Sequence, residues 1–158
     1  MTPHATTRTV RTADADGLVP LYTTLSHPAT AAQIRSRLER LTGDPTYELW
    51  VAEAAAGELL GFAAGHLLFP VEDDAPAAQL IALVTAEEAR GKGVGTALCA
   101  AFEAWAVERG AARTMLNSST RRTEAHAFHT RRGYTASGVR FSKFLWYQST
   151  GYGEGLGR

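Results

Sequence analysis

The segment ARGKGVGTAL, residues 89–98, carries three glycines and two cations at the entrance to a helix-like stretch. Glycines at this density indicate a backbone that comes very close to a ligand, most often a phosphate group. A Walker loop requires Ser or Thr after its lysine, whereas Lys92 is followed by Gly93. A dinucleotide fingerprint that starts at Gly91 or Gly93 meets Thr96 or Leu98 where a small residue is required. The segment therefore predicts a phosphate-binding turn of another kind.

The residues on either side place this turn between a strand and a helix. AAQLIALVTA, residues 77–86, is a short apolar run, typical of a strand that is covered on both faces. Residues 96–110 have apolar side chains at helical spacing and end at a glycine. The amides of such a turn point along the helix axis, where the macrodipole adds roughly half a positive charge. With Arg90 and Lys92 beside it, and no hydroxyl ligand for magnesium after Lys92, the turn should hold a diphosphate without hydrolysing it.

The remaining periodicities predict an α/β chain with a mixed sheet and helices on both faces. Asp14 is the expected cap of the first helix. The expected strands are 6–12, 47–54, 59–69, 77–86, 112–118, 134–138 and 139–147, and the expected helices are 14–26, 29–41, 96–110 and 122–133. We expect one domain over residues 1–148, followed by a glycine-rich tail over 149–158.

Composition excludes several classes of protein. The chain of 158 residues has 16 basic and 16 acidic side chains, whereas nucleic-acid and membrane-surface proteins carry a basic excess. A single cysteine leaves no disulfide framework and no multi-thiolate metal site. The N-terminal residues have no apolar run typical of a signal peptide, so we expect a cytoplasmic protein with no nucleic-acid or membrane partner.

Two motifs in order resemble the GNAT family of N-acetyltransferases. LVTAEEARGKGVGTAL resembles the family's acetyl-CoA motif, in which Arg or Gln is followed by x-x-Gly-x-Gly/Ala, here Arg90, Gly93 and Gly95. RRTEAHAFHTRRGY resembles the next motif, a helix that ends in an aromatic pair, three variable residues and Gly-Tyr. The similarity runs from about Gln79 to Leu145. It implies a GNAT fold with a mostly antiparallel sheet and direct transfer of acetyl from acetyl-CoA to an amine, without a metal.

The resemblance also implies a set of site residues. The strand end at Leu83, Val84 and Thr85 would separate from its neighbour and pair with the pantetheine arm. One amide there, assigned to Val84 with the register open by one residue, would polarise the thioester carbonyl. Arg122 either reaches a coenzyme A phosphate or is an exposed charge. The full cofactor-binding set comprises Leu83, Val84, Thr85, Arg90, Gly91, Lys92, Gly93, Val94, Gly95, Thr96, Asn117 and Arg122.

The chain departs from the family pattern at His129. The family usually has a tyrosine second in the aromatic pair, where its hydroxyl protonates the departing thiolate, but this chain reads Phe128-His129. His129 either acts as that general acid or is a passive substitute, because a thiolate whose thiol has a pKa of about 8.5 is not a very poor leaving group.

No residue is a clear general base, although an alkylamine is mostly protonated at neutral pH and needs one. The acidic loop at Glu72, Asp73 and Asp74 either attracts a cationic substrate or is merely solvated. His66 alternates with Phe62 and Ala64 and is either a histidine of the core or rim, or a functional group. His126 lies three residues before His129, but two histidines without a third ligand do not make a zinc site.

We therefore expect an acetyl-CoA-dependent acyltransferase that acts on a small amine such as an antibiotic, an aminoalkyl compound, a polyamine or an amino acid derivative. The alternatives are a protein or peptide N-acetyltransferase and, from another class, a non-catalytic acyl-CoA sensor. The strand-like FLWYQ, residues 144–148, is a candidate contact in a homodimer.

Overall fold

Five strands form one sheet in the order β1-β2-β3-β4-β5 in the computed structural model, which describes residues 5–145. The first four strands pair antiparallel, and β5 lies parallel to β4. This mixed, mostly antiparallel sheet agrees with the sequence prediction. The strands are β1 (Thr6–Thr9), β2 (Tyr47–Glu53), β3 (Leu59–Leu68), β4 (Ala77–Thr85) and β5 (Arg113–Leu116).

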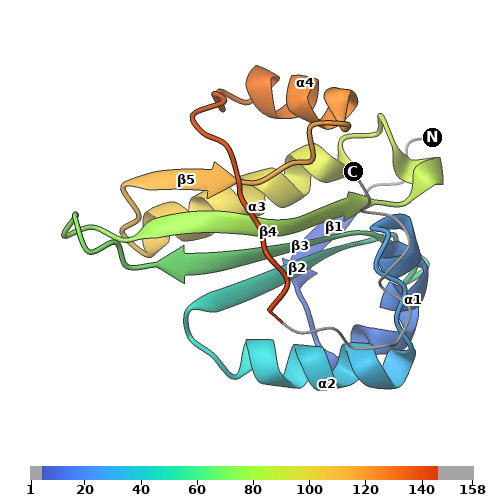
Figure 1. The fold of residues 1–158 in the computed structure, drawn as a ribbon. Coiled ribbons are helices and arrows are strands. Elements are labelled where there is room, and N and C mark those ends of the chain that lie inside the picture. Colours follow the sequence, from blue (N-terminus) through green and yellow to red (C-terminus); the bar gives the residue numbers. More distant parts are fainter. Residues whose placement is uncertain (1–4, 146–158) are drawn as a thin grey trace. The chain divides into compact units, whose positions relative to one another are not determined.

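Helices cover both faces of the sheet. The helices α1 (Ala15–Thr24) and α2 (Ala31–Thr42) lie on one face, and α3 (Val94–Glu108) lies on the other (Figure 1). α2 begins with a reciprocal capping box, in which Thr30 accepts the Gln33 amide and the Gln33 side chain accepts the Thr30 amide.

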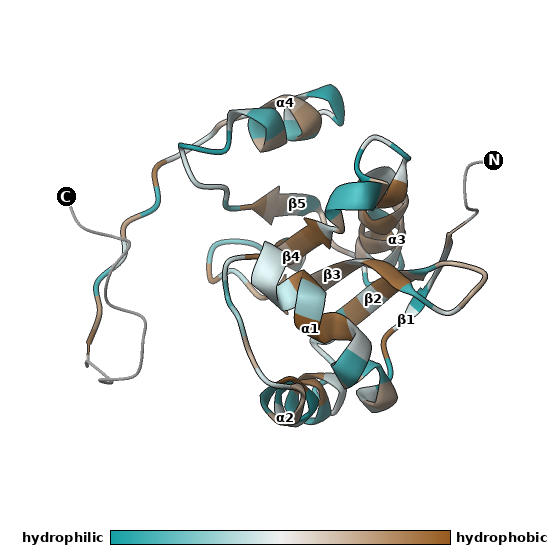
Figure 2. Cartoon of the chain, turned by 90° about the vertical axis from the view of Figure 1, so that its right-hand side faces the viewer, coloured by the Kyte–Doolittle hydropathy of each residue, from teal (hydrophilic) through white to brown (hydrophobic). Residues whose placement is uncertain are grey.

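Alternation along β3 decides which helix each side chain meets. The Phe62 ring lies 6.0 Å from the ring of Tyr22 in α1, whereas a Cβ added at Gly65 would lie 2.8 Å from Phe102 of α3. The glycine therefore lets α3 approach the sheet closely. Figure 2 shows that the central strands are largely apolar and that α2 turns a polar side outward.

The α3 side of the core is aromatic. The ring of Trp50 from β2 meets the rings of Phe102 and Trp105 edge-on, with centroid distances of 6.3 and 5.6 Å. Edge-to-face packing of this kind adds to the burial of apolar area. α3 is thereby fixed on the sheet, and so is the glycine turn that precedes it.

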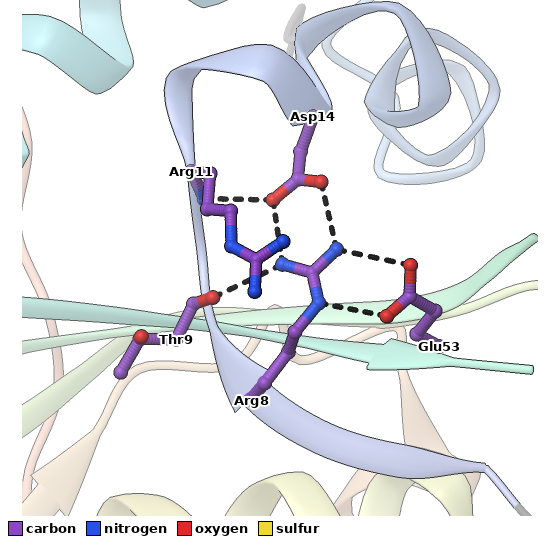
Figure 3. Close-up of polar contacts among 5 residues, drawn as sticks. All are labelled: Arg8, Thr9, Arg11, Asp14 and Glu53. Carbon is purple, nitrogen blue, oxygen red and sulfur yellow. Dashed lines mark hydrogen bonds and ion pairs between the residues drawn. The ribbon is translucent and has the colours of Figure 1, made fainter. Parts of the chain in front are cut away.

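One ion network joins β1, β2 and the start of α1 (Figure 3). The guanidinium of Arg8 donates to both carboxylate oxygens of Asp14, at 2.8 and 2.9 Å, and to Glu53 at 2.8 and 3.2 Å. Asp14 stands at the expected cap position, but its carboxylate makes no cap bond to α1. It accepts from Arg8 and from the Arg11 amide instead, and it closes the short 3-10 turn at Thr12–Asp14.

Replacing Arg8 with alanine is expected to destabilise the fold by about 1–3 kcal/mol, because it leaves the largely buried Asp14 carboxylate with only the Arg11 amide as donor. Hydrogen bonds from Arg8 are the main cause of the lowered pKa values of Asp14 and Glu53. Because both folded-state pKa values are lowered, their contribution is complete above the ordinary carboxyl range of about pH 4 and disappears as pH falls further. Thermal melts from pH 3 to 7 check this; an Arg8→Ala protein that melts like the wild type at pH 7 would contradict it.

Residues from Ser119 onward form a second unit that contains α4 (Thr123–Arg131). The strands expected at 134–138 and 139–147 are not formed in the described residues of this unit, which end at 145. The side chains of Val139, Phe141, Phe144 and Leu145 are between 78% and 91% exposed. β-branched and aromatic residues such as Val139, Phe141 and Phe144 favour strands, but a strand also needs a paired neighbour. The tail at 149–158, and the domain boundary predicted before it, lie outside the described residues.

Candidate functional site

The glycine turn connects the end of β4 to α3 through a single 3-10 turn at Glu87–Ala89. Gly91 and Gly93 have φ angles of 73° and 82°, in the left-handed region that favours glycine. A Cβ at either position would meet nothing within 4 Å, so both glycines border open space. Lys92 lies between them and is exposed, as is Arg90 before them.

The first turn of α3 contains backbone amides that can donate hydrogen bonds to a ligand. Its first internal hydrogen bond runs from the Ala97 amide to the Gly93 carbonyl at 3.0 Å. The N-cap residue is Gly93, which has no side chain that could cap the helix. The amides of Val94, Gly95 and Thr96 therefore have no partner within the helix. Open glycines, unpartnered amides, the helix dipole and two cations together fit the diphosphate of coenzyme A.

β4 separates from β5 before it reaches this turn. The parallel pairing begins at Ala77 and Arg113 and ends at Leu80 and Leu116. Leu83, Val84 and Thr85 lie beyond it, paired with β3 on one side only in the part of the chain that the structure describes. This edge of β4 is thus open over the residues that the sequence singled out.

The ladder with β3 decides which amides face the open edge. The Ala86 amide donates to the Leu60 carbonyl at 2.9 Å, and Val84 lies opposite Phe62 two residues earlier. Backbone groups of alternate residues point to the same side of a strand, so those of Val84 point toward β3. The amides of Leu83 and Thr85 point to the open edge. The Val84 amide, the candidate oxyanion donor from the sequence, therefore faces β3 and not the open edge.

A β-bulge marks the place where the edge opens. Ala64 pairs with Ala82 and Gly65 pairs with Leu80, which leaves Ile81 as the extra residue of β4. Its side chain is 44% exposed. Bulges bend a strand locally and interrupt pairing, which is consistent with β4 leaving β5 directly after Leu80.

Two polar residues follow β5 at the same opening. Asn117, a predicted cofactor residue, is exposed directly after the strand. Ser118 was not predicted: its hydroxyl is buried and has no hydrogen-bond partner among the described residues. An unpaired buried hydroxyl is costly, so it is a polar atom available to a ligand. Sequence alone does not distinguish it from the serine that follows it.

Two further groups of acidic residues lie near the sheet. Glu72, Asp73 and Asp74 are exposed in the loop between β3 and β4, where Asp73 accepts the Ala75 amide. Separately, a cavity of about 410 Å³ lies beside α1 and the turn between β2 and β3. Glu58, Glu87 and Glu88 line it, so its charge has the wrong sign for a diphosphate.

The unit with α4 holds the other two predicted residues, Arg122 and His129. Arg122 is exposed at the N-cap of α4. Burial is the main cause of a lowered His129 pKa, and the charges of Arg122, His126 and Arg132 add to it. His129 Nδ1 is buried with no hydrogen-bond partner in this part of the structure, and the ring lies 5.8 Å from that of Tyr134.

His126 has a structural partner. Its Nε2 lies 2.8 Å from the backbone oxygen of Ser119, which ties α4 to the chain before it. Within residues 5–145, no three histidine, cysteine or acidic side chains gather as a metal site would require. No helix in the same range is both long and apolar enough to cross a membrane.

Comparison with known proteins gives one family and several relatives. The model of the acetyltransferase (GNAT) family matches residues 18–134. An aminoalkylphosphonate N-acetyltransferase of Salmonella typhimurium is 34% identical over 89 residues. That match covers 56% of this chain and 58% of the relative, so it spans just over half the length of either protein.

Solved structures agree in fold. A GNAT family acetyltransferase of Staphylococcus aureus superposes with a TM-score of 0.77 at 24% identity, over 90% of this chain and 99% of that chain. The aminoglycoside N-acetyltransferase AAC(6')-Iy in complex with CoA superposes with a TM-score of 0.80 at 19% identity, over 92% and 98%.

Proposed function

Because the chain belongs to the acetyltransferase (GNAT) family, we propose that it transfers acetyl from acetyl-CoA to the primary amine of a small molecule. The observation that carries this proposal is the open edge of β4, which runs into a glycine turn at an uncapped helix start. A diphosphate on the turn would let the pantetheine arm follow the open edge as an added strand. We place the reaction in the cytoplasm.

Leu83 is the proposed oxyanion donor. Of the two amides on the open edge, that of Thr85 is nearer the turn, and that of Leu83 is nearer the bulge. The arm runs from the turn toward the bulge, so its reacting end meets Leu83. The amine nitrogen attacks the carbonyl carbon and forms a C–N bond while the Leu83 amide donates to the developing oxyanion. The nitrogen, positively charged after the attack, releases a proton to water. Collapse of the intermediate then breaks the C–S bond, and the thiolate takes a proton.

The acceptor is proposed from two observations. The Salmonella relative is named for aminoalkylphosphonates, and AAC(6')-Iy is an aminoglycoside N-acetyltransferase. In this chain, the exposed Glu72, Asp73 and Asp74 would raise the local concentration of a cationic amine. A small amine with a second polar group meets both observations.

Thiol release from acetyl-CoA tests the function against a panel of aminoalkylphosphonates, aminoglycosides, polyamines and peptides, with calorimetry for binding. Turnover of a small amine is expected. Turnover of peptides alone would favour the protein-directed alternative, and binding without turnover would favour the sensor. Failure to bind coenzyme A would overturn the proposal.

We assign the proton donor to His129. Because the pKa of His129 is lowered, His129 loses its proton at a pH below the ordinary histidine value of 6.5 as the pH rises. The turnover number should therefore decline on the alkaline side earlier than with a tyrosine donor. His129→Phe should lower kcat by roughly 10²-fold or more, with a smaller effect on KM for acetyl-CoA.

The neighbouring His126 supplies the matched control. His126→Phe removes an imidazole one helical turn away and should retain an alkaline decline, displaced to slightly higher pH because the charge of His126 helps to lower the His129 pKa. Near-wild-type turnover of the His129→Phe protein would mean that the thiolate leaves without this donor.

We further propose that two copies associate through the segment that includes Phe144 and Leu145, whose exposed apolar side chains support such a contact. Sedimentation at increasing concentration, with Phe144→Ser as the disrupted variant, tests this proposal.

A further inference from the structure

His66 lies on the face of the sheet that is opposite α3. Phe62 contacts Tyr22 of α1, and residues 62, 64 and 66 of β3 point the same way. Gly65 belongs to the alternate set of β3 residues and faces Phe102 of α3 on the opposite side of the sheet. Since the proposed diphosphate site is where α3 begins, the amine would approach from the face that carries His66.

His66 packs against an aromatic ring and is partly exposed to solvent. Its ring stacks on Tyr47 of β2, with centroids 4.2 Å apart and planes 20° apart. It lies opposite Gln79 of β4, and both residues are half-buried. Gln79 comes two residues before the bulged and exposed Ile81, so this pair borders the place where the edge opens.

The carboxylate of Asp44 interacts electrostatically with His66. The pKa of Asp44 is lowered, chiefly by hydrogen bonds from Thr46 and additionally by attraction to His66. The Asp44 carboxylate is held in place because Oδ1 accepts from both the amide and the hydroxyl of Thr46, at 2.9 and 2.7 Å.

β4 itself offers no proton acceptor of the required kind. Its residues, AAQLIALVT, include no acid and no histidine, although a protonated amine must lose a proton before it can attack. Resting on the proposed function, we propose that His66 accepts this proton through water held by Gln79.

The spacing of the sheet makes the water necessary. His66 is three residues along β3 from Ala63, about 10 Å, and Leu83 lies a further strand spacing of about 5 Å from Ala63. Gln79 is its direct cross-strand neighbour, with Cβ atoms about 5 Å apart. One or two waters beside Gln79 bridge the rest of the distance. The ammonium proton passes through water to the imidazole, the freed lone pair attacks the thioester, and the imidazolium later returns its proton to solvent.

The test compares two nucleophiles that differ in their need for a base, each measured in the variant against the wild type. In His66→Gln, kcat/KM for an alkylamine should fall by roughly 10²-fold. With hydroxylamine, which is already neutral at the assay pH, the fold-loss of kcat/KM in the same variant should be less than about a third as large. KM for acetyl-CoA should stay at the wild-type value. His27→Gln, which removes the imidazole after α1, is the matched control and should resemble the wild type.

The possible outcomes distinguish proton transfer by His66 from a role in packing alone. An equal loss with both nucleophiles would show that His66 acts only through packing on Tyr47, and no loss with the alkylamine would show that it takes no proton. Either result overturns this inference while turnover by the wild type leaves the proposed function standing. A wild-type protein that acetylates neither nucleophile overturns both.

Discussion

Replacing Leu83 with proline is expected to lower kcat by roughly 10²–10³-fold while coenzyme A still binds. Proline removes the Leu83 amide, which points to the open edge of β4 and takes no part in the ladder with β3. Proline is tolerated in strands at such unpaired positions. The expected factor is that for the loss of one preorganised donor to a developing oxyanion.

Two variants separate this effect from side-chain packing and from damage to the sheet. Leu83→Ala shortens the side chain but keeps the amide, so its kcat should stay close to the wild-type value. Val84→Pro breaks the ladder with Phe62 and should melt at a clearly lower temperature. Equal turnover of Leu83→Pro and Leu83→Ala would exclude the Leu83 amide as the donor. Steady-state kinetics, calorimetry and thermal melts supply the three measurements.

Replacing Gly93 with aspartate is expected to weaken acetyl-CoA binding by roughly 100-fold or more, which corresponds to at least about 2.8 kcal/mol. Aspartate tolerates a left-handed backbone better than most residues, and the space around Gly93 is open. Its carboxylate would attract the uncapped amides of α3 and repel a diphosphate. Because a negative charge at a helix start is favourable, thermal stability should change little.

Gly110 provides the opposite case at the other end of α3. It has a φ of 76° and the same open surroundings, but it stands where the dipole is negative. Gly110→Asp should therefore lower the melting temperature and leave acetyl-CoA binding unchanged. If both variants bind acetyl-CoA as the wild type does, the turn is not the diphosphate site.

The sequence predicted the helices and the central strands because their apolar residues recur with a clear period. The glycine turn could also be placed between a strand and a helix from local residues alone. Two further strands were predicted at 134–138 and 139–147, but the described residues through Leu145 do not form them. Periodicity indicates which residues can form a strand, whereas the ladder depends on a partner elsewhere in the chain.

The candidate site divides in the same way. Residues 89–98 by themselves predicted an anion-binding turn before a helix, because glycine content, cations and a helix start are local properties. Only the tertiary structure decided that Leu83, and not Val84, faces the open edge, because that depends on the register with β3 and on a bulge at Ile81. It also brought His66 opposite Gln79, which lies 13 positions away in the sequence. Such pairings arise when separate segments meet, and no single segment encodes them.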